Sequence, residues 1–180
     1  MGNYKRLKRE LKHKGIIVDF YADTMQLPNG KEAVWDFIKH KGAAAVIPVM
    51  DDGKICMVRQ YRNAIERETL EIPAGGLNPN ESMKECAMRE LEEETGYKSN
   101  QVEFLMDFYS AVAYSSEKIE IYVAKNLVPS KQHLDEDEFI NVETYTIEEL
   151  AEKVFNREIA DSKTVAAIMA YKVKYQNGKQ

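Results

Sequence analysis

The sequence predicts an α/β protein in which a mixed β-sheet carries helices on its faces. Segments rich in β-branched and aromatic residues, separated by turn residues, dominate the chain between residues 15 and 145. Helical spacing of apolar residues is confined to one segment in the middle and to the part after residue 146. With 180 residues and 44% hydrophobic content, the chain can bury a core, and no repeat or low-complexity linker divides it.

The N-terminal part predicts an antiparallel strand extension. Residues 15–21 and 32–38 have strand composition, and Pro28-Asn29-Gly30 between them is typical of a turn. We therefore assign residues 1–40 to this extension, as a dimerisation element, and residues 41–180 to the main domain. The cationic run before it, within residues 5–14, is interpreted as a solvated terminus. Trp35, the only tryptophan, is by default a core or interface residue, and ligand stacking is the sharper alternative.

Residues 43–61 predict a β-hairpin. A nearly continuous apolar run, residues 43–50, is followed by Asp51-Asp52-Gly53 and then by a second strand-like segment, residues 54–61. This segment ends in Arg59-Gln60-Tyr61-Arg62, where guanidinium groups could grip a phosphate through two parallel hydrogen bonds. For either arginine, a surface salt bridge is an equally good interpretation.

One predicted helix follows a loop rich in Gly, Asn and Pro. Asn80 or Ser82 is its candidate N-cap, and Gly96 stands where a left-handed C-terminal cap is expected. Its apolar stripe is formed at four-residue steps by Met83, Ala87 and Leu91.

Carboxylates gather on the same predicted helix. Glu90, Glu93 and Glu94 stand three and four residues apart, so their side chains converge on one side. Arg89 can pair with Glu85 or Glu93. Each like-charged pair destabilises an exposed helix by about 0.2 to 0.5 kcal/mol, so the group suggests a bound cation, with a solvated acidic face as the alternative.

Further strands and two helices are predicted after this helix. Residues 102–109, 118–124 and 139–145 have strand composition. Thr146-Ile147-Glu148-Glu149 matches a capping box that opens a helix, and Asp161 or Ser162 begins another that runs toward Tyr175. The run Asp135-Glu136-Asp137-Glu138 is typical of a solvated loop, but beside a metal site it could supply a ligand or a general base.

Composition restricts the partners. A net charge of −5 and a pI of about 5.4 argue against a nucleic-acid partner. The absence of a long apolar segment argues against secretion and membrane insertion, so we expect a cytoplasmic protein. Cys56 and Cys86 are expected to pack as small apolar groups, and the three scattered histidines argue against a His-based metal site.

Carboxylate oxygens are the ligands that Mg²⁺ and Mn²⁺ prefer. Mg²⁺ usually binds through a few carboxylates together with substrate phosphates, so the residues predict a phosphoanhydride substrate. The ions would neutralise the charge that develops on the leaving oxygen and lower the pKa of the attacking water.

The helix and its preceding loop resemble the Nudix box. That signature is Gly, five residues, Glu, seven residues, Arg-Glu, a bulky apolar residue, any residue, Glu-Glu, any residue, Gly and another bulky residue. Tyr97 stands where an aliphatic residue is more common. The resemblance implies an α/β/α sandwich that hydrolyses a nucleoside diphosphate linked to another moiety. The matching residues are Gly75, Glu81, Arg89, Glu90, Leu91, Glu93, Glu94 and Gly96.

Segments outside the box are similar to the ADP-ribose pyrophosphatase branch of this family, namely Arg59 to Arg62, Glu71 to Gly75, and Ser115 to Lys118. The resemblance implies metal binding by the Ala74 carbonyl, Glu90, Glu94 and Glu138. It implies catalysis by Glu136, as the base for water, together with Glu93 and Arg89. The register of residues 135–138 admits a shift by one. The implied substrate contacts are Trp35, Arg59, Arg62 and Glu71.

The function implied is Mg²⁺-dependent hydrolysis of ADP-ribose to AMP and ribose 5-phosphate. Relatives in this branch are homodimers that exchange N-terminal strands, which would put Trp35 near the partner's site, against adenine or ribose. Ala113 stands where the branch commonly has a proline, which weakens the assignment of ADP-ribose specifically. The alternatives are another nucleoside diphosphate sugar, such as GDP-mannose, or a non-catalytic nucleotide sensor, which the intact glutamates of the box disfavour.

Overall fold

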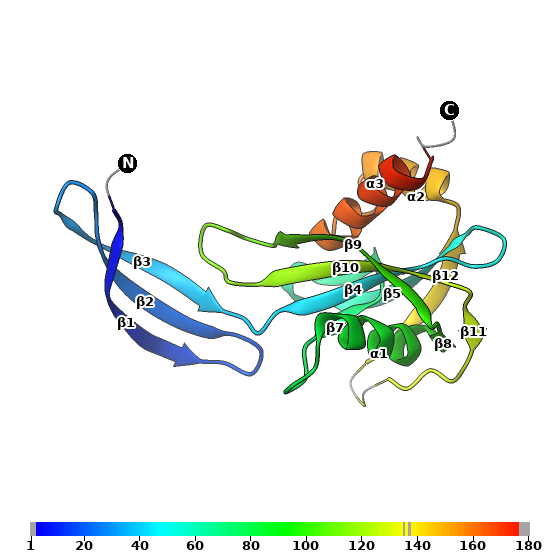
Figure 1. Cartoon of the computed structure of the whole chain (residues 1–180), viewed down its shortest axis with the longest axis horizontal. Helices are drawn as coiled ribbons and strands as arrows, with labels where there is room; N and C mark the ends of the chain where they lie inside the picture. Colours follow the sequence, from blue (N-terminus) through cyan, green and yellow to red (C-terminus); the bar gives the residue numbers. More distant parts are fainter. Residues whose placement is uncertain (1–2, 135, 137, 177–180) are drawn as a thin grey trace. The chain divides into compact units, whose positions relative to one another are not determined.

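The computed structural model describes residues 3–134, 136 and 138–176, and the chain divides into two compact units (Figure 1). The first unit comprises Met1–Gly42 and Tyr109–Lys118. The second comprises Ala43–Phe108 and Ile119–Gln180.

The first unit is built on a three-stranded antiparallel sheet in the order β1-β2-β3: β1 Lys5–Lys14, β2 Asp19–Gln26 and β3 Glu32–Lys39. The predicted turn closes β2 and β3, with the Gly30 amide donating to the Leu27 carbonyl at 2.9 Å. Gly30 has φ +82°, a conformation that glycine adopts without strain. The predicted strand extension is thereby confirmed.

Strand β1 corrects one expectation. Its side chains are largely exposed, as a solvated terminus would be, but its backbone pairs with β2 along its length. Arg9 explains the pairing, because its guanidinium donates to both oxygens of Asp23 on β2, at 2.6 and 2.5 Å. The same guanidinium lies 3.6 Å from the centre of the Phe37 ring on β3. One arginine therefore ties the three strands together.

The residues between two later strands complete the first unit. The Ile38 amide donates to the Tyr114 carbonyl at 2.7 Å, and the Ser116 amide donates to the Ile38 carbonyl at 3.0 Å. The connection 109–118 is thus hydrogen-bonded to the end of β3.

The second unit contains a mixed four-stranded sheet in the order β7-β4-β10-β9. Strand β4 is parallel to β10 and antiparallel to β7. An antiparallel sheet, β12-β5-β6, and the pair β11-β8 complete its strands. The strands are β4 Ala43–Pro48, β5 Ile55–Arg62, β6 Arg67–Glu71, β7 Ala74–Gly76, β8 Tyr97–Lys98, β9 Gln101–Tyr109, β10 Lys118–Lys125, β11 Val128–Pro129 and β12 Asn141–Tyr145, with a 3-10 turn, η1, at Asn63–Ile65.

The predicted hairpin of residues 43–61 is wrong. Both strands exist, but only the isolated bridge between Val49 and Ile55 joins them, and β4 and β5 belong to different sheets. Strand β4 is buried along its whole length, and it uses its two edges for β7 and β10. Strand β5 pairs instead with β6 and β12. The turn was predicted correctly, but its partners lie far away in the sequence.

Helices cover both faces of the mixed sheet, as Figure 1 shows: α1 Met83–Thr95 on one face, and α2 Ile147–Phe155 and α3 Ser162–Gln176 on the other. Successive residues of β4 point to opposite faces and so enter two separate cores. Ala45 and Ile47 pack with Leu150 of α2 and Ile168 of α3. On the other face, the sheet residues Ala44, Val46 and Tyr122 pack against three residues of α1, namely Cys86, Ala87 and Leu91. The α/β/α sandwich is confirmed.

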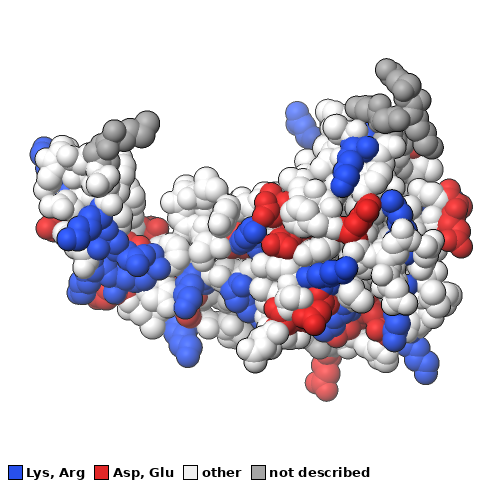
Figure 2. Space-filling view, viewed as in Figure 1, with Lys and Arg blue, Asp and Glu red and all other residues white. Residues whose placement is uncertain are grey.

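Three further features concern the cysteines, the helices and the surface charges. Cys56 and Cys86 are buried free thiols, as predicted. No helix in the part of the chain that the structure describes is long and apolar enough to cross a membrane. Lys and Arg side chains gather over the N-terminal sheet, while charges of both signs are interspersed on the visible face of the second unit (Figure 2).

Candidate active site

Helix α1 has the ends that its sequence predicts. Ser82 is the N-cap; its hydroxyl accepts from the Glu85 amide at 3.3 Å, and Glu85 accepts in turn from the Ser82 amide at 2.9 Å. Gly96 ends the helix with φ +72°. Because Glu85 is used by the cap, Arg89 pairs with other carboxylates.

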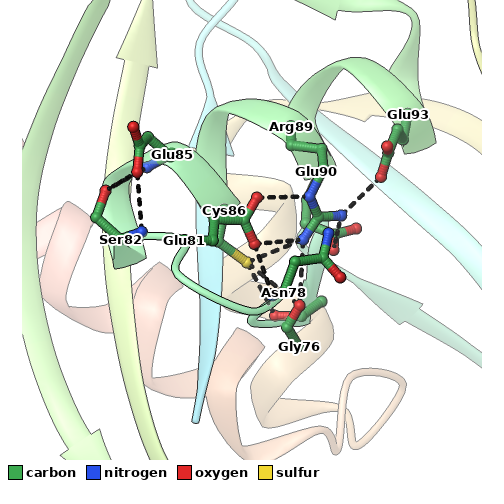
Figure 3. Close-up of polar contacts among 10 residues, drawn as sticks. Gly76, Asn78, Glu81, Ser82, Glu85, Cys86, Arg89, Glu90 and Glu93 are labelled. Atoms are coloured by element: carbon green, nitrogen blue, oxygen red, sulfur yellow. Dashed lines mark hydrogen bonds and ion pairs between the residues drawn. The ribbon is translucent and has the colours of Figure 1, made fainter. Parts of the chain in front are cut away.

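Arg89 lies at the centre of the acidic group (Figure 3). Its guanidinium donates to both oxygens of Glu81 at 2.7 and 3.0 Å, to Glu90 at 2.6 Å and to Glu93 at 2.7 Å. It also donates to the Gly76 carbonyl at 3.1 Å. The hydrogen bond from Arg89 lowers the pKa of Glu81 to about 2. Arg89 therefore fastens the helix to the glycine-rich loop before it.

Glu90 is buried against that loop. A Cβ atom added at Gly75 would lie 1.8 Å from Oε1 of Glu90, so only a glycine leaves room for the carboxylate. Burial raises the pKa of Glu90, although the charge of Arg89 opposes this effect. A cation close to Glu90 would therefore stabilise its charged form.

Glu94 lies one helical turn further on and is only 3% exposed. Its Oε2 accepts a hydrogen bond of 3.0 Å from the Ala74 amide. Burial, followed by the charge of Glu90, raises the pKa of Glu94 to about 8. The backbone of Ala74 is therefore held directly beside the second buried carboxylate.

These carboxylates fit a hard divalent cation in their chemistry, because two buried acids with raised pKa values are stabilised by added positive charge. Among the described residues, no group of three or more His, Cys, Asp and Glu side chains is gathered as a complete metal cage. Glu93 is turned to Arg89. Glu92 contacts Lys98 and Ser130 instead.

The acidic loop that precedes β12 is docked on the end of α1. Gln132 donates to the Glu94 carbonyl at 2.7 Å, and the His133 amide donates to the Glu93 carbonyl at 3.0 Å. Glu136 is exposed, while Asp135 and Asp137 lie outside the described residues. Glu138 is half-buried, and its charge contributes to the raised pKa values of Glu90 and Glu94.

Both arginines of β5 form ion pairs. Arg59 donates to Glu143 on β12 at 2.5 and 3.1 Å, and Arg62 donates to Glu71 on β6 at 2.7 and 2.6 Å. Burial acts to raise the pKa of Glu71, but the hydrogen bonds and charges of Arg62 and Lys163 outweigh it and hold the pKa at about 2. Trp35 lies in the first unit, on β3, 46% exposed and with its ring centre 5.7 Å from that of Tyr4.

Comparison with known proteins identifies the family. A model of the NUDIX domain matches residues 39–167. The chain belongs to the Nudix family. An ADP-ribose pyrophosphatase of Bacillus subtilis (strain 168) is 40% identical over 172 residues, 94% of this chain and 93% of that protein. A methanol dehydrogenase activator of Bacillus methanolicus is also 40% identical, over 91% of this chain and 90% of its own length.

A more distant relative and a solved structure also match this chain over most of its length. An ADP-ribose pyrophosphatase of Mycobacterium tuberculosis (strain ATCC 25618 / H37Rv) is 31% identical over 93% of this chain and 83% of its own length. A crystal structure of an ADP compounds hydrolase superposes with a TM-score of 0.88, covering 99% of this chain and 97% of that one, at 23% identity, and supports the fold. The protein is a Nudix hydrolase, and Nudix hydrolases generally depend on divalent metals.

The Nudix box explains Glu81, whose position the signature contains but whose contact with Arg89 sequence reasoning did not predict. Three further residues were not predicted as part of the site, although Asp161 was predicted as a candidate helix start. Thr69 and Lys163 both donate to Glu71, and Asp161 accepts from Lys163 at 2.9 Å. Lys163 stands 92 residues from Glu71 in the sequence, so no local pattern could have indicated the contact.

Proposed function

We propose that this protein hydrolyses the pyrophosphate bond of ADP-ribose in a Mg²⁺-dependent reaction that releases AMP and ribose 5-phosphate. The observation that carries the proposal is the buried pair Glu90 and Glu94, held in a complete Nudix box beside the Ala74 backbone. The names of the relatives from B. subtilis and M. tuberculosis support the choice of substrate.

The proposed metal ligands are the carboxylates of Glu90, Glu94 and Glu138 and the carbonyl of Ala74. Their support is the burial of Glu90 and Glu94 and the electrostatic proximity of Glu138 to both. Bound Mg²⁺, or Mn²⁺ in its place, would neutralise charge on the phosphates and lower the pKa of the attacking water.

The remaining residues of the box hold the site together in this proposal. Arg89 fixes the carboxylates of Glu90 and Glu93 and ties them to the loop at Gly76. Glu136, exposed in the acidic loop, accepts the proton of the water whose oxygen bonds to phosphorus while the bond to the bridging oxygen breaks. The docking of this loop on α1 supports its place in the reaction.

The substrate is held by groups outside the box. Arg59 and Arg62 grip the diphosphate, and Glu71 holds Arg62. In the strand-exchanged homodimer proposed below, Trp35 stacks on adenine or ribose in the site of the partner chain. The exposed ring of Trp35 is consistent with stacking.

The first experiment is a product analysis with purified protein and Mg²⁺. ADP-ribose, GDP-mannose, ADP-glucose, a dinucleoside polyphosphate and a nucleoside triphosphate are supplied separately, with and without chelator. We expect rapid release of AMP from ADP-ribose, and we expect chelator to stop this release. A clear preference for another compound contradicts the substrate, and binding without hydrolysis favours a sensor. The panel is broad because a relative at 40% identity is named an activator.

A homodimer with exchanged N-terminal strands is part of the proposal. Its support is the set of large apolar side chains that the first unit exposes, among them Leu11, Ile16, Ile17 and Val34. Light scattering coupled to size-exclusion chromatography should give twice the mass of one chain. Ile17→Asp should shift the mass toward one chain, and a wild-type protein that elutes as a monomer contradicts the dimer.

A further inference from the structure

We propose that Lys163 is a positioning residue that aims the guanidinium of Arg62 at the substrate phosphates through the buried carboxylate of Glu71. The inference rests on the proposed function, because it assumes that Arg62 contacts the diphosphate. Lys163 stands at the start of α3, far from the Nudix box in sequence, and it is not part of that motif.

Both carboxylate oxygens of Glu71 accept two hydrogen bonds each. Oε1 accepts from Arg62 Nε at 2.7 Å and from the Thr69 hydroxyl at 2.5 Å. Oε2 accepts from Arg62 Nη2 at 2.6 Å and from Lys163 Nζ. A carboxylate offers about four acceptor positions, and here four donors use them. The carboxyl plane is thus fixed from three different residues.

This arrangement determines the direction of Arg62. A guanidinium is planar, and Arg62 turns the edge made by Nε and Nη2 toward Glu71. The opposite edge, which carries Nη1, must point away from Glu71. The Arg62 side chain is 43% exposed, while that of Glu71 is 1% exposed. The buried carboxylate therefore holds one edge of the guanidinium, and the rest of the group is accessible to solvent. An anchored arginine with an open edge suits bidentate binding of phosphate oxygens.

Lys163 connects this pair to α3. Its ammonium also donates to Asp161 at 2.9 Å, and Asp161 accepts from the Thr164 amide and hydroxyl at 3.0 and 2.6 Å. Thr164 Oγ1 in turn accepts from the Ile72 amide at 3.1 Å, two residues before Ala74. The start of α3 is therefore braced against the strand that leads into the box.

Charge balance argues against an accidental contact. Two cations, Arg62 and Lys163, face two anions, Glu71 and Asp161, and Lys163 is only 8% exposed. A buried lysine is expensive unless it is paired, and leaving its partner buried without it is expensive too. Without Lys163, Oε2 of Glu71 would accept a hydrogen bond from Arg62 alone, and Oε1 would keep Arg62 and Thr69, so the arginine would be drawn toward the buried carboxylate.

The test measures equilibrium binding of ADP-ribose in chelator, where no turnover occurs, and then the steady-state kinetics with Mg²⁺. Lys163→Met keeps the length of the side chain and removes its charge. We expect Kd and KM to rise about tenfold while kcat changes less than threefold, because a charge-assisted contact outside the reacting centre is weakened. Lys163→Arg should recover most of the loss. Lys172→Met, on the same helix, is the matched control and should leave Kd unchanged.

A double-mutant cycle separates positioning from general structural support. Arg62→Ala should raise Kd by tenfold or more, and adding Lys163→Met to it should raise Kd by less than twofold further. Full additivity overturns the inference, because Lys163 would then act independently of Arg62. An unchanged Kd in Lys163→Met overturns it as well.

Two controls keep these results distinct. If the wild-type protein binds ADP-ribose but hydrolyses none, the proposed function fails, while the binding cycle still decides the role of Lys163. If Lys163→Met does not fold, Thr69→Val takes its place, because it removes one hydrogen bond from Glu71 at almost constant volume. We then expect Kd to rise about threefold only when Arg62 is present, and no change overturns the inference.

Discussion

The N-terminal sheet and helix α1 each hold an arginine against carboxylates, but with a different balance of charge. Arg9 faces the single carboxylate of Asp23. Arg89 faces three carboxylates, those of Glu81, Glu90 and Glu93. The first arrangement is neutral and can serve as a structural tie between strands. The second leaves a surplus of negative charge, which a structural role does not require and a bound cation would satisfy.

The largest difference between the two regions should follow from Glu94→Gln. The substitution removes the charge and keeps the shape, so we expect kcat for AMP release to fall about 10³-fold or more. The unfolding temperature without metal should stay constant or rise, because burial disfavours the charged carboxylate. Glu92→Gln is the control, since Glu92 faces Lys98 and Ser130. A Glu94→Gln variant with full activity and metal affinity would refute the role of this carboxylate.

Gly75→Ala should have the next largest effect. The new methyl group would overlap the carboxylate of Glu90, which is the end of a flexible side chain and can move. We therefore expect activity to fall about 10- to 100-fold at a nearly constant unfolding temperature. Gly30→Ala is the counterpart in the N-terminal sheet. Nothing lies within 4 Å of its Cβ position, so only the strain of φ +82°, about 1 kcal/mol, should appear, without loss of activity. Equal activity losses in both variants would contradict the comparison.

Acid should remove the contribution of the buried Glu71 carboxylate to stability. The folded pKa of Glu71, about 2, lies below its ordinary value of 4.5. The carboxylate therefore stabilises the fold above pH 4.5, and this contribution, up to about 3 kcal/mol, is lost as the pH falls from 4.5 to 2. Glu71→Gln should unfold earlier than wild type at pH 7, and the difference in unfolding free energy should shrink toward pH 2. A difference that does not change with pH would show that packing, not charge, is responsible.

The smallest effect is expected at Glu10. The hydrogen bonds from Lys12 and Lys8 lower its pKa to about 2, which by itself suggests a strong interaction. All three side chains are exposed on β1, however, so water and salt screen the charges and flexible side chains lose entropy on pairing. Glu10→Gln should leave the unfolding temperature and kcat unchanged within error. A clear loss of stability would mean that β1 depends on its surface charges as well as on Arg9.

Local patterns in the sequence predicted what depends on neighbouring residues. The caps of α1 at Ser82 and Gly96 and the capping box of α2 at Thr146 follow from spacing along each helix. The hairpin of residues 43–61 failed because strand composition does not say which strand is the partner. The pairing of Lys163 with Glu71 could not be predicted for the same reason, since both residues have unremarkable neighbours in the sequence. Strand β1 was not predicted because its sequence is rich in Lys and Arg and lacks the β-branched and aromatic residues that are typical of strands.

Successive side chains of β4 enter two different cores, and this arrangement couples the two faces of the sheet during unfolding. Its odd-numbered residues Ala43, Ala45 and Ile47 belong to one core, and Ala44 and Val46 belong to the other. A slip by one residue would send every side chain into the wrong core, so neither layer can loosen alone without disturbing the other. The amide protons of β4 should accordingly be among the last to exchange with deuterium, at a rate set by global unfolding.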